Sequence, residues 1–323
     1  MKPEIKRVLA RFGPFLGLIF VFVVFAALSP SAFTSFYNIK TILTQSVIIG
    51  IAALGMTFVI ISAGIDLSVG SQIALGTVVA AVVIKSGIAP PGLWLPMLAA
   101  FLAVLACAST GLLSGLIITR FRIVPFIVTL GTMQIARGVA KWFGSEQTVP
   151  TADNWLNLLM LVDPEPRWLI VAPGIWLCIV LLVVSVVLLR STLLGRYTFA
   201  IGSNEQTARL CGIKVDRIKV VIYSLCGLFT GIAAVLQYGY LTVGDPTTAV
   251  GLELDIIAAV VIGGGSLSGG EGSAFGSVIG ALIMAVLRNG CNMLGVPNYV
   301  QEIIIGVIII GAVLVDQQKH KLQ

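Results

Sequence analysis

The sequence predicts an all-α, polytopic membrane protein with about ten transmembrane or partly spanning helices. Two observations carry this prediction. The 323 residues are 58% hydrophobic and only 11% charged, whereas soluble domains are about a quarter charged. Apolar stretches also recur from end to end with short polar gaps, and a helix of about 20 apolar residues crosses a bilayer. Since no stretch remains for a soluble domain, we expect residues 1–323 to form a single transmembrane domain.

The expected segments follow from the alternation of apolar runs and polar gaps. They lie near residues 12–29, 42–62, 69–85, 93–119, 124–141, 168–190, 219–240, 255–266, 273–294 and 299–316. The 255–266 segment is too short to span a bilayer alone. The first segment follows a basic stretch and has the shape of a secretory signal peptide. Because the rest of the chain is also apolar, we interpret it as an uncleaved signal anchor.

The distribution of Lys and Arg predicts the topology, because cytoplasmic loops are enriched in these residues. An even number of crossings places the two termini on one side, and both are basic, so both are expected in the cytoplasm. The 191–218 loop has an excess of basic residues and is expected there as well. The 143–167 loop is acidic and contains or borders several tryptophans, so we expect it outside. The basic residues of the termini are Lys2, Lys6, Arg7, Arg11, Lys319 and Lys321.

Two stretches of small and acidic residues, 63–70 and 253–270, interrupt the helical pattern. In the predicted topology the helices that precede them, 42–62 and 219–240, run in opposite directions. This arrangement suggests a possible inverted repeat with discontinuous helices around a central path, as many transporters have.

Enzymatic chemistry finds no support in the sequence. The one histidine, His320, lies close to the C-terminus, so no Ser-His-Asp triad and no His/Cys metal site is expected. The glycine-rich run 263–272 contains neither GxxxxGK[ST] nor GxGxxG, so we expect no ATPase or dinucleotide site in this chain. The net charge of +6 resides in loops and tails, which topology explains better than nucleic-acid binding. We therefore predict a chain with no catalytic residues, cofactor or metal.

The cytoplasmic loop contains a pattern typical of a short helix. Ser203 is expected to cap this helix, Gln206 to complete a capping box, and Gly212 to end it. Glu205 and Arg209 form a supporting i, i+4 pair. From the residues alone the helix is either a docking element for a partner protein or an interfacial helix lying on the bilayer.

Three runs together resemble the permeases of monosaccharide ABC importers of the ribose/xylose/arabinose/galactose type. They are GMTFVIISAGIDLSVGS (55–71), AIGSNEQTARLCGI (200–213) and ELDIIAAVVIGG (253–264). The resemblance implies a multi-pass protein of the cell inner membrane that translocates a monosaccharide, ribose being the first candidate. It implies three kinds of partner: an ABC ATPase subunit that hydrolyses ATP, a periplasmic sugar-binding protein, and a second permease chain, identical or a sister.

The resemblance also assigns roles to residues. It favours docking of the ATPase on the cytoplasmic helix, through Ser203, Asn204, Glu205, Gln206, Ala208, Arg209, Leu210 and Gly212. The interrupted stretches supply the candidates for a gate or pathway, namely Asp66, Ser68, Gly70, Asp255, Gly263, Gly264 and Gly265. Asp66 and Asp255 either cap the helix that follows or take part in gating, since a charge in a membrane requires a partner or a purpose.

Rival interpretations remain open at this point. A permease of the same build could carry a branched-chain amino acid, a nucleoside or an autoinducer. An ion-coupled secondary transporter would need a network of ionisable groups inside the membrane, for which Asp66 and Asp255 are few. A purely structural membrane subunit would show no solute flux.

Overall fold

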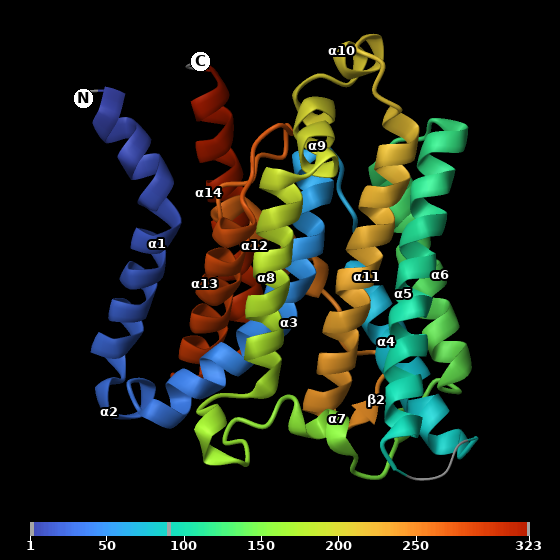
Figure 1. The fold of residues 1–323 in the computed structure, drawn as a ribbon. Helices are drawn as coiled ribbons and strands as arrows, with labels where there is room; N and C mark the ends of the chain where they lie inside the picture. Colours follow the sequence, from blue (N-terminus) through green and yellow to red (C-terminus); the bar gives the residue numbers. More distant parts are fainter. Residues whose placement is uncertain (1–2, 89–91, 322–323) are drawn as a thin grey trace.

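The computed structural model describes residues 3–88 and 92–321, which fold almost entirely into α-helices (Figure 1). The long helices are α1 (Pro3–Leu28), α3 (Phe36–Ile61), α4 (Val69–Ser86), α5 (Trp94–Phe121), α6 (Pro125–Phe143), α8 (Pro173–Ser191), α11 (Val215–Leu241), α12 (Leu252–Ile262), α13 (Ala274–Met293) and α14 (Asn298–Lys321). Every predicted segment coincides with one of these helices.

Shorter elements connect the long helices. They are α2 (Pro30–Phe33), α7 (Trp155–Leu158), the 3₁₀ helix η1 (Arg167–Leu169), α9 (Leu193–Ser203), α10 (Glu205–Leu210) and the strands β1 (Val149–Pro150) and β2 (Val243–Gly244). The strands pair antiparallel, with Val149 opposite Gly244. The acidic 143–167 loop is thereby joined to the segment between α11 and α12.

Six helices within the described residues are long and apolar enough to cross a bilayer, namely α3, α4, α5, α8, α11 and α13. Shorter apolar stretches lie in α1 (Gly13–Leu28) and α14 (Asn298–Leu314). The fold class, a polytopic all-helical membrane protein, is therefore confirmed. The predicted 255–266 segment ends earlier than expected, because α12 stops at Ile262 and Gly264 adopts φ +94°, a left-handed conformation that favours glycine.

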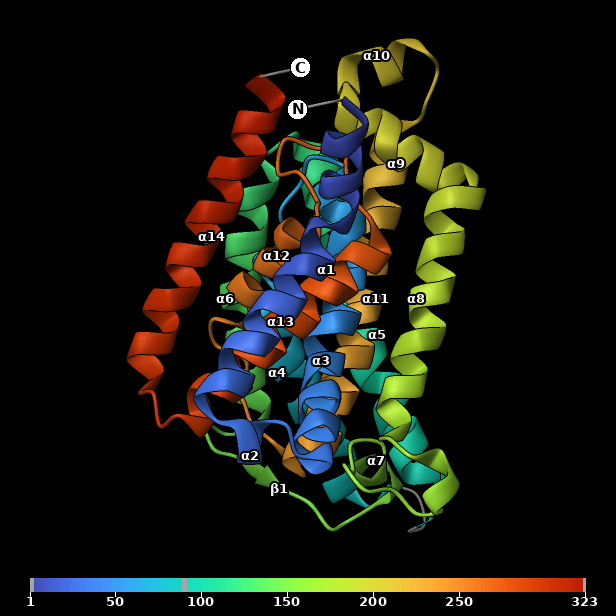
Figure 2. The ribbon, with the colours of Figure 1, turned by 90° about the vertical axis from the view of Figure 1, so that its left-hand side faces the viewer.

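Helix α3 occupies the centre of the molecule. Its most apolar window is 94% buried, whereas that of α8 is only 22% buried. Helices α11, α12 and α13 pack around α3, and α1 crosses the outer side of α13 (Figure 2). The exposed residues of α8 from Trp176 to Val187 are all apolar, as expected of a surface in contact with lipid. The core is therefore built around α3, which the other helices enclose on nearly all sides.

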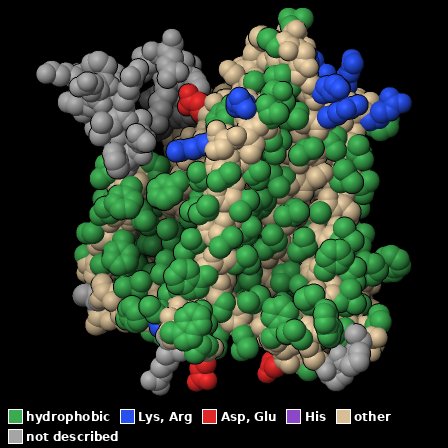
Figure 3. Space-filling model, viewed as in Figure 1, with side chains coloured by type: hydrophobic (Ala, Val, Ile, Leu, Met, Phe, Trp, Pro, Cys, Tyr) green, Lys and Arg blue, Asp and Glu red, His purple; other side chains and the backbone are tan. Residues whose placement is uncertain are grey.

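The two ends of the bundle differ in charge. The start of α1, the end of α14 and α10 all lie at one end, and β1, β2 and α7 lie at the other (Figures 1 and 2). Most of the visible Lys and Arg gather at the α10 end, above a broad apolar band (Figure 3). This arrangement agrees with the predicted placement of both termini and the 191–218 loop on one side. Residue Lys2 and the side chains of Lys6, Arg7, Arg11, Arg167, Lys319, His320 and Lys321 lie outside the described part of the structure.

Helices α3 and α11 run in opposite directions (Figure 1) and pack against each other. The sequence pattern anticipated the opposite directions. The inverted repeat itself stays a prediction.

Candidate functional site

Helix α10 forms within the 191–218 loop where the sequence predicts a helix, but its cap differs by one residue. Asn204, not Ser203, is the N-cap: its side-chain oxygen accepts a hydrogen bond from the amide of Thr207 at 2.9 Å. Ser203 instead ends α9, and the capping box through Gln206 is wrong because Gln206 is not the third residue after the true cap. Gly212 follows the helix at φ +83°, as expected of a terminating glycine.

Helix α9 was not predicted. Thr192 caps it, accepting a hydrogen bond from the amide of Gly195 at 3.4 Å. The helix leads directly into α10 through Asn204, so the 191–218 loop consists of two consecutive helices. The Thr192 cap after the apolar run of α8 was the available sequence signal.

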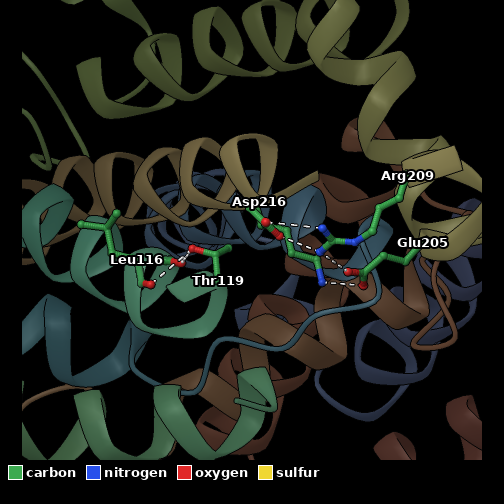
Figure 4. Close-up of polar contacts among 7 residues, drawn as sticks. Leu116, Thr119, Glu205, Arg209 and Asp216 are labelled. Atoms are coloured by element: carbon green, nitrogen blue, oxygen red, sulfur yellow. Dashed lines mark hydrogen bonds and ion pairs between the residues drawn. The ribbon is translucent and has the colours of Figure 1, made fainter. Parts of the chain in front are cut away.

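A network of charged side chains fixes α10 to the start of α11 (Figure 4). The Arg209 guanidinium donates to Glu205 at 3.0 Å and to Asp216 at 2.6 Å, and Lys219 Nζ donates to Glu205 at 2.6 Å. Partial burial acts to raise the pKa of Glu205, but the hydrogen bonds and charges of Lys219 and Arg209 lower it below the usual value. The two carboxylates raise the pKa of Arg209. The carboxylate of Glu205 therefore stays charged and holds two helices together.

The two faces of α10 differ sharply. Ala208 is buried and packs with Ile201 and Val215, whereas Leu210 is 88% exposed. Gln206 and Thr207 are exposed as well. Leu210 is thus a large apolar side chain exposed on an otherwise polar helix.

Asp66 lies fully buried in the break between α3 and α4. Its Oδ1 atom accepts hydrogen bonds from the amide of Ser68 at 2.9 Å and from its hydroxyl at 2.5 Å. Gln72 Nε2 donates in turn to the Ser68 hydroxyl at 2.7 Å. The expected hydrogen bond to the backbone just ahead of α4 is present, so Asp66 stabilises the turn; a part in gating stays a prediction.

Asp255 does not cap a helix. It is the fourth residue of α12, whose N-cap is Gly251 at φ +81°. Its buried carboxylate forms an ion pair with Arg288 of α13, whose Nε donates to Oδ2 at 2.7 Å. The prediction of a cap at Asp255 is therefore wrong, because a distant arginine satisfies this carboxylate.

The glycine-rich segment after α12 contacts the ends of two other helices. The amide of Gly270 donates to the carbonyl of Ile61, the last residue of α3, at 2.9 Å. Gly202 of α9 packs on the same carbonyl so closely that a Cβ atom there would collide with Ile61 O. A Cβ on Gly269 would come within 2.7 Å of the Cβ of Ala63. The two interrupted stretches of the sequence thus meet at the point where α9 leads into α10.

Other predicted pathway residues serve close packing. A Cβ on Gly70 would collide with Glu253 Oε2, so Gly70 lets the start of α4 approach the start of α12. A Cβ on Gly263 would likewise collide with the Gly276 carbonyl of α13. Gly264 and Gly265 close the end of α12 through amide hydrogen bonds to Val261 and Val260.

Sequence reasoning missed two arginines inside the apolar spans. Arg288 pairs with Asp255, and Arg137 of α6 donates through Nη1 to the carbonyls of Pro246 and Thr248, at 2.9 and 2.7 Å. Arginine within a membrane helix is rare and usually functional or paired. That rarity was the signal that could have identified both residues.

The fold and this site define a class: a multi-pass membrane protein with interrupted spans and a charged helix projecting from one end. The family model described as "Branched-chain amino acid transport system / permease component" matches residues 38–313. The chain belongs to this permease family.

Curated relatives resemble the chain over nearly its whole length. The ribose import permease protein RbsC of Bacillus subtilis is 41% identical over 97% of this chain and 94% of its own. RbsC of Escherichia coli K12 is 40% identical over 94% and 93%, and the L-arabinose transport system permease protein AraH of the same strain is 35% identical over 98% and 93%. No solved structure matches.

Proposed function

We propose that this chain is the membrane-spanning subunit of an ATP-driven importer that carries a monosaccharide, with ribose as the first candidate, across the cell inner membrane. The observation that carries the proposal is the similarity to two ribose import permeases, at 40 and 41% identity over nearly the full length. The arabinose permease, at 35% identity, supports a pentose as the substrate.

The partners follow from the same proposal. An ABC ATPase docks on α10 and hydrolyses ATP, a periplasmic sugar-binding protein docks on the 143–167 loop, and a second permease chain completes the path. The exposed Leu210 and its fixed helix support the first contact. Both termini then lie in the cytoplasm, in line with the basic residues gathered at the α10 end (Figure 3).

The mechanism we infer is alternating access. Closure of the ATPase subunits moves α10, and α9 passes the movement to Ile61 and the glycine-rich segment, because Gly202 packs against both. The break at Asp66 and the segment 263–270 then rearrange, and sugar passes to the cytoplasm. The sugar leaves readily if the external binding protein supplies most of the affinity.

Reconstitution tests the proposal. The permease, the ATPase and the binding protein encoded with it are placed in proteoliposomes, and uptake of labelled ribose, arabinose and leucine is measured with and without ATP. ATP-dependent ribose uptake that requires all three components is expected. Uptake that continues without ATP and stops with an uncoupler would instead identify an ion-coupled transporter.

A second candidate substrate comes from the family description, which names branched-chain amino acids. Leucine uptake in the same proteoliposomes, with no uptake of either pentose, would favour it. Competition by unlabelled sugars against labelled ribose then ranks the pentoses.

A further inference from the structure

A pocket of about 440 Å³ lies between α10, the start of α11 and the turn that joins α5 to α6. Its apolar wall consists of Ile118, Ile123, Val124 and Pro125. Its charged wall consists of the network described above together with Arg122. An apolar wall beside a charged one suits a ligand that is itself amphipathic.

The charged wall has an excess of positive charge. Arg122, Arg209 and Lys219 face two carboxylates, those of Glu205 and Asp216. The carboxylates are already engaged by Arg209 and Lys219. The charge of Arg122 helps to lower the pKa of Asp216, but within the described part of the chain Arg122 forms no ion pair as close as those of Arg209 and Lys219. Its guanidinium donors therefore remain available to an anionic group.

The position of the pocket indicates where that anion comes from. Helix α5 ends at Phe121 and α6 begins at Pro125, so the Arg122 turn lies at the end of the bundle that carries α10. Phe121, Val124 and Ile127 beside it are 68, 60 and 59% exposed. These side chains extend the apolar wall toward the exposed apolar flank of α5 and α6, which offers an acyl chain a surface to lie on.

We propose that this pocket binds an anionic phospholipid, with the headgroup phosphate at Arg122 and the upper acyl chain along Ile123 and Val124. Guanidinium groups bind phosphate oxygens through paired hydrogen bonds, and basic pockets between helices on the cytoplasmic side bind anionic headgroups. A phosphate at Arg122 also lies next to Arg209, so the lipid joins the α5–α6 turn to α10. Its influence on ATPase coupling rests on the proposed function; the binding does not.

The test is a titration of the purified full chain with phosphatidylglycerol, read by native mass spectrometry, beside phosphatidylcholine and inorganic phosphate. Arg122→Gln removes the proposed contact. Arg120→Gln is the matched control, because Arg120 is an exposed cation two residues earlier that does not line the pocket. We expect Arg122→Gln to weaken phosphatidylglycerol binding about fivefold, the effect of one basic residue near an anionic surface, and Arg120→Gln to leave it within about twofold.

Four outcomes overturn the proposal. If Arg122→Gln and Arg120→Gln lose the same amount of phosphatidylglycerol affinity, the lipid is held by general attraction to a basic surface. If the unaltered chain binds phosphatidylcholine as tightly as phosphatidylglycerol, the pocket does not select an anionic headgroup. Competition by inorganic phosphate at the same concentration as lipid means a free-phosphate site. Unchanged phosphatidylglycerol affinity in Arg122→Gln means that Arg122 does not hold the headgroup. Because the titration contains no sugar and no ATP, its failure leaves the transport proposal untouched.

Discussion

The amide nitrogen of Gly270 donates a hydrogen bond to the carbonyl oxygen of Ile61 across 2.9 Å. The last carbonyls of a helix lack partners within it, so the glycine-rich segment satisfies the end of the central helix. The segment is therefore held by a backbone contact that a small displacement can break and remake. Gly202, near the end of α9, packs against both atoms of this hydrogen bond.

Gly202→Ala should separate α9 from the end of α3 and from the glycine-rich segment. The added methyl group collides with the Ile61 carbonyl and approaches the Gly270 amide, and overpacking of this kind costs about 1–3 kcal/mol. We expect a lower thermal midpoint in detergent and loss of sugar-stimulated ATPase activity. Gly306→Ala on α14, where a Cβ meets nothing within 4 Å, is the matched control. A Gly202→Ala protein with normal stability and transport would contradict the packing described here.

Leu210→Asp tests the docking surface. Because Leu210 is 88% exposed, its replacement should leave the thermal midpoint unchanged, while a charge in an apolar contact abolishes stimulation of the ATPase. Thr207→Asp, which adds the same charge to the first turn of the same helix at an exposed residue outside the assigned docking set, should retain most of the coupling. Unchanged transport by Leu210→Asp would remove α10 as the docking element.

Arg288→Met leaves the carboxylate of Asp255 buried without its partner. Breaking a fully buried ion pair from one side destabilises by about 3–5 kcal/mol, whereas replacing both charges with apolar residues is often neutral. Because the Arg288 side chain is 38% exposed and Asp255 is buried, we expect a loss below that range. The double variant Asp255→Leu/Arg288→Met should therefore recover most of the lost stability. Thermal unfolding of the two single variants and the double variant measures this; a double variant as unstable as Arg288→Met would show that the pair does not act as a unit.

Asp66→Asn separates stabilisation of the turn from gating. Asparagine keeps an oxygen that accepts the hydrogen bonds from Ser68, so folding should persist, whereas Asp66→Ala leaves buried donors unpaired and should cost about 1–3 kcal/mol. If Asp66 only stabilises the turn, Asp66→Asn transports normally. A well-folded Asp66→Asn protein without transport would assign the charge to gating.

Acidification should loosen α10. The folded-state pKa of Glu205 is lowered by its basic partners, so its stabilising effect is fully present above the ordinary glutamate value of about 4.3 and disappears as pH falls through the lower folded-state value. The protection factors of the amides of 205–210, meaning the intrinsic exchange rate divided by the observed rate at the same pH, should fall in that acidic range. In Glu205→Gln these protection factors should be low at neutral pH as well, with no further change on acidification through this range.

Hydropathy predicted the spans because the bilayer imposes a length and a composition on each helix separately. The charges of the loops likewise predicted which end holds α10. The single-residue error at its cap arose because Ser203 and Asn204 are both good capping residues, and only the preceding helix α9 decides between them. The local sequence pattern is therefore sufficient to predict that a helix forms, but not which residue begins or ends it.

The site could not be assembled from the sequence, because its contacts join distant segments. The partner of Asp255 is 33 residues away, and the Ile61–Gly270 contact is between backbone atoms that no side-chain pattern identifies. The pairing of Val149 with Gly244 likewise joins the backbones of two segments that are distant in the sequence. Such contacts are set by how helices pack, which periodicity does not encode.

The short β1–β2 ladder ties the 143–167 loop to the segment between α11 and α12. That segment enters α12, and α12 continues into the glycine-rich segment that touches α3 and α9. The two proposed docking surfaces, α10 and the 143–167 loop, are therefore connected by a continuous path of covalent bonds, hydrogen bonds and packing contacts. Binding at two coupled sites is reciprocal. If a partner bound to the 143–167 loop changes the affinity of α10 for its partner by some factor, the partner on α10 changes the affinity of the 143–167 loop by the same factor.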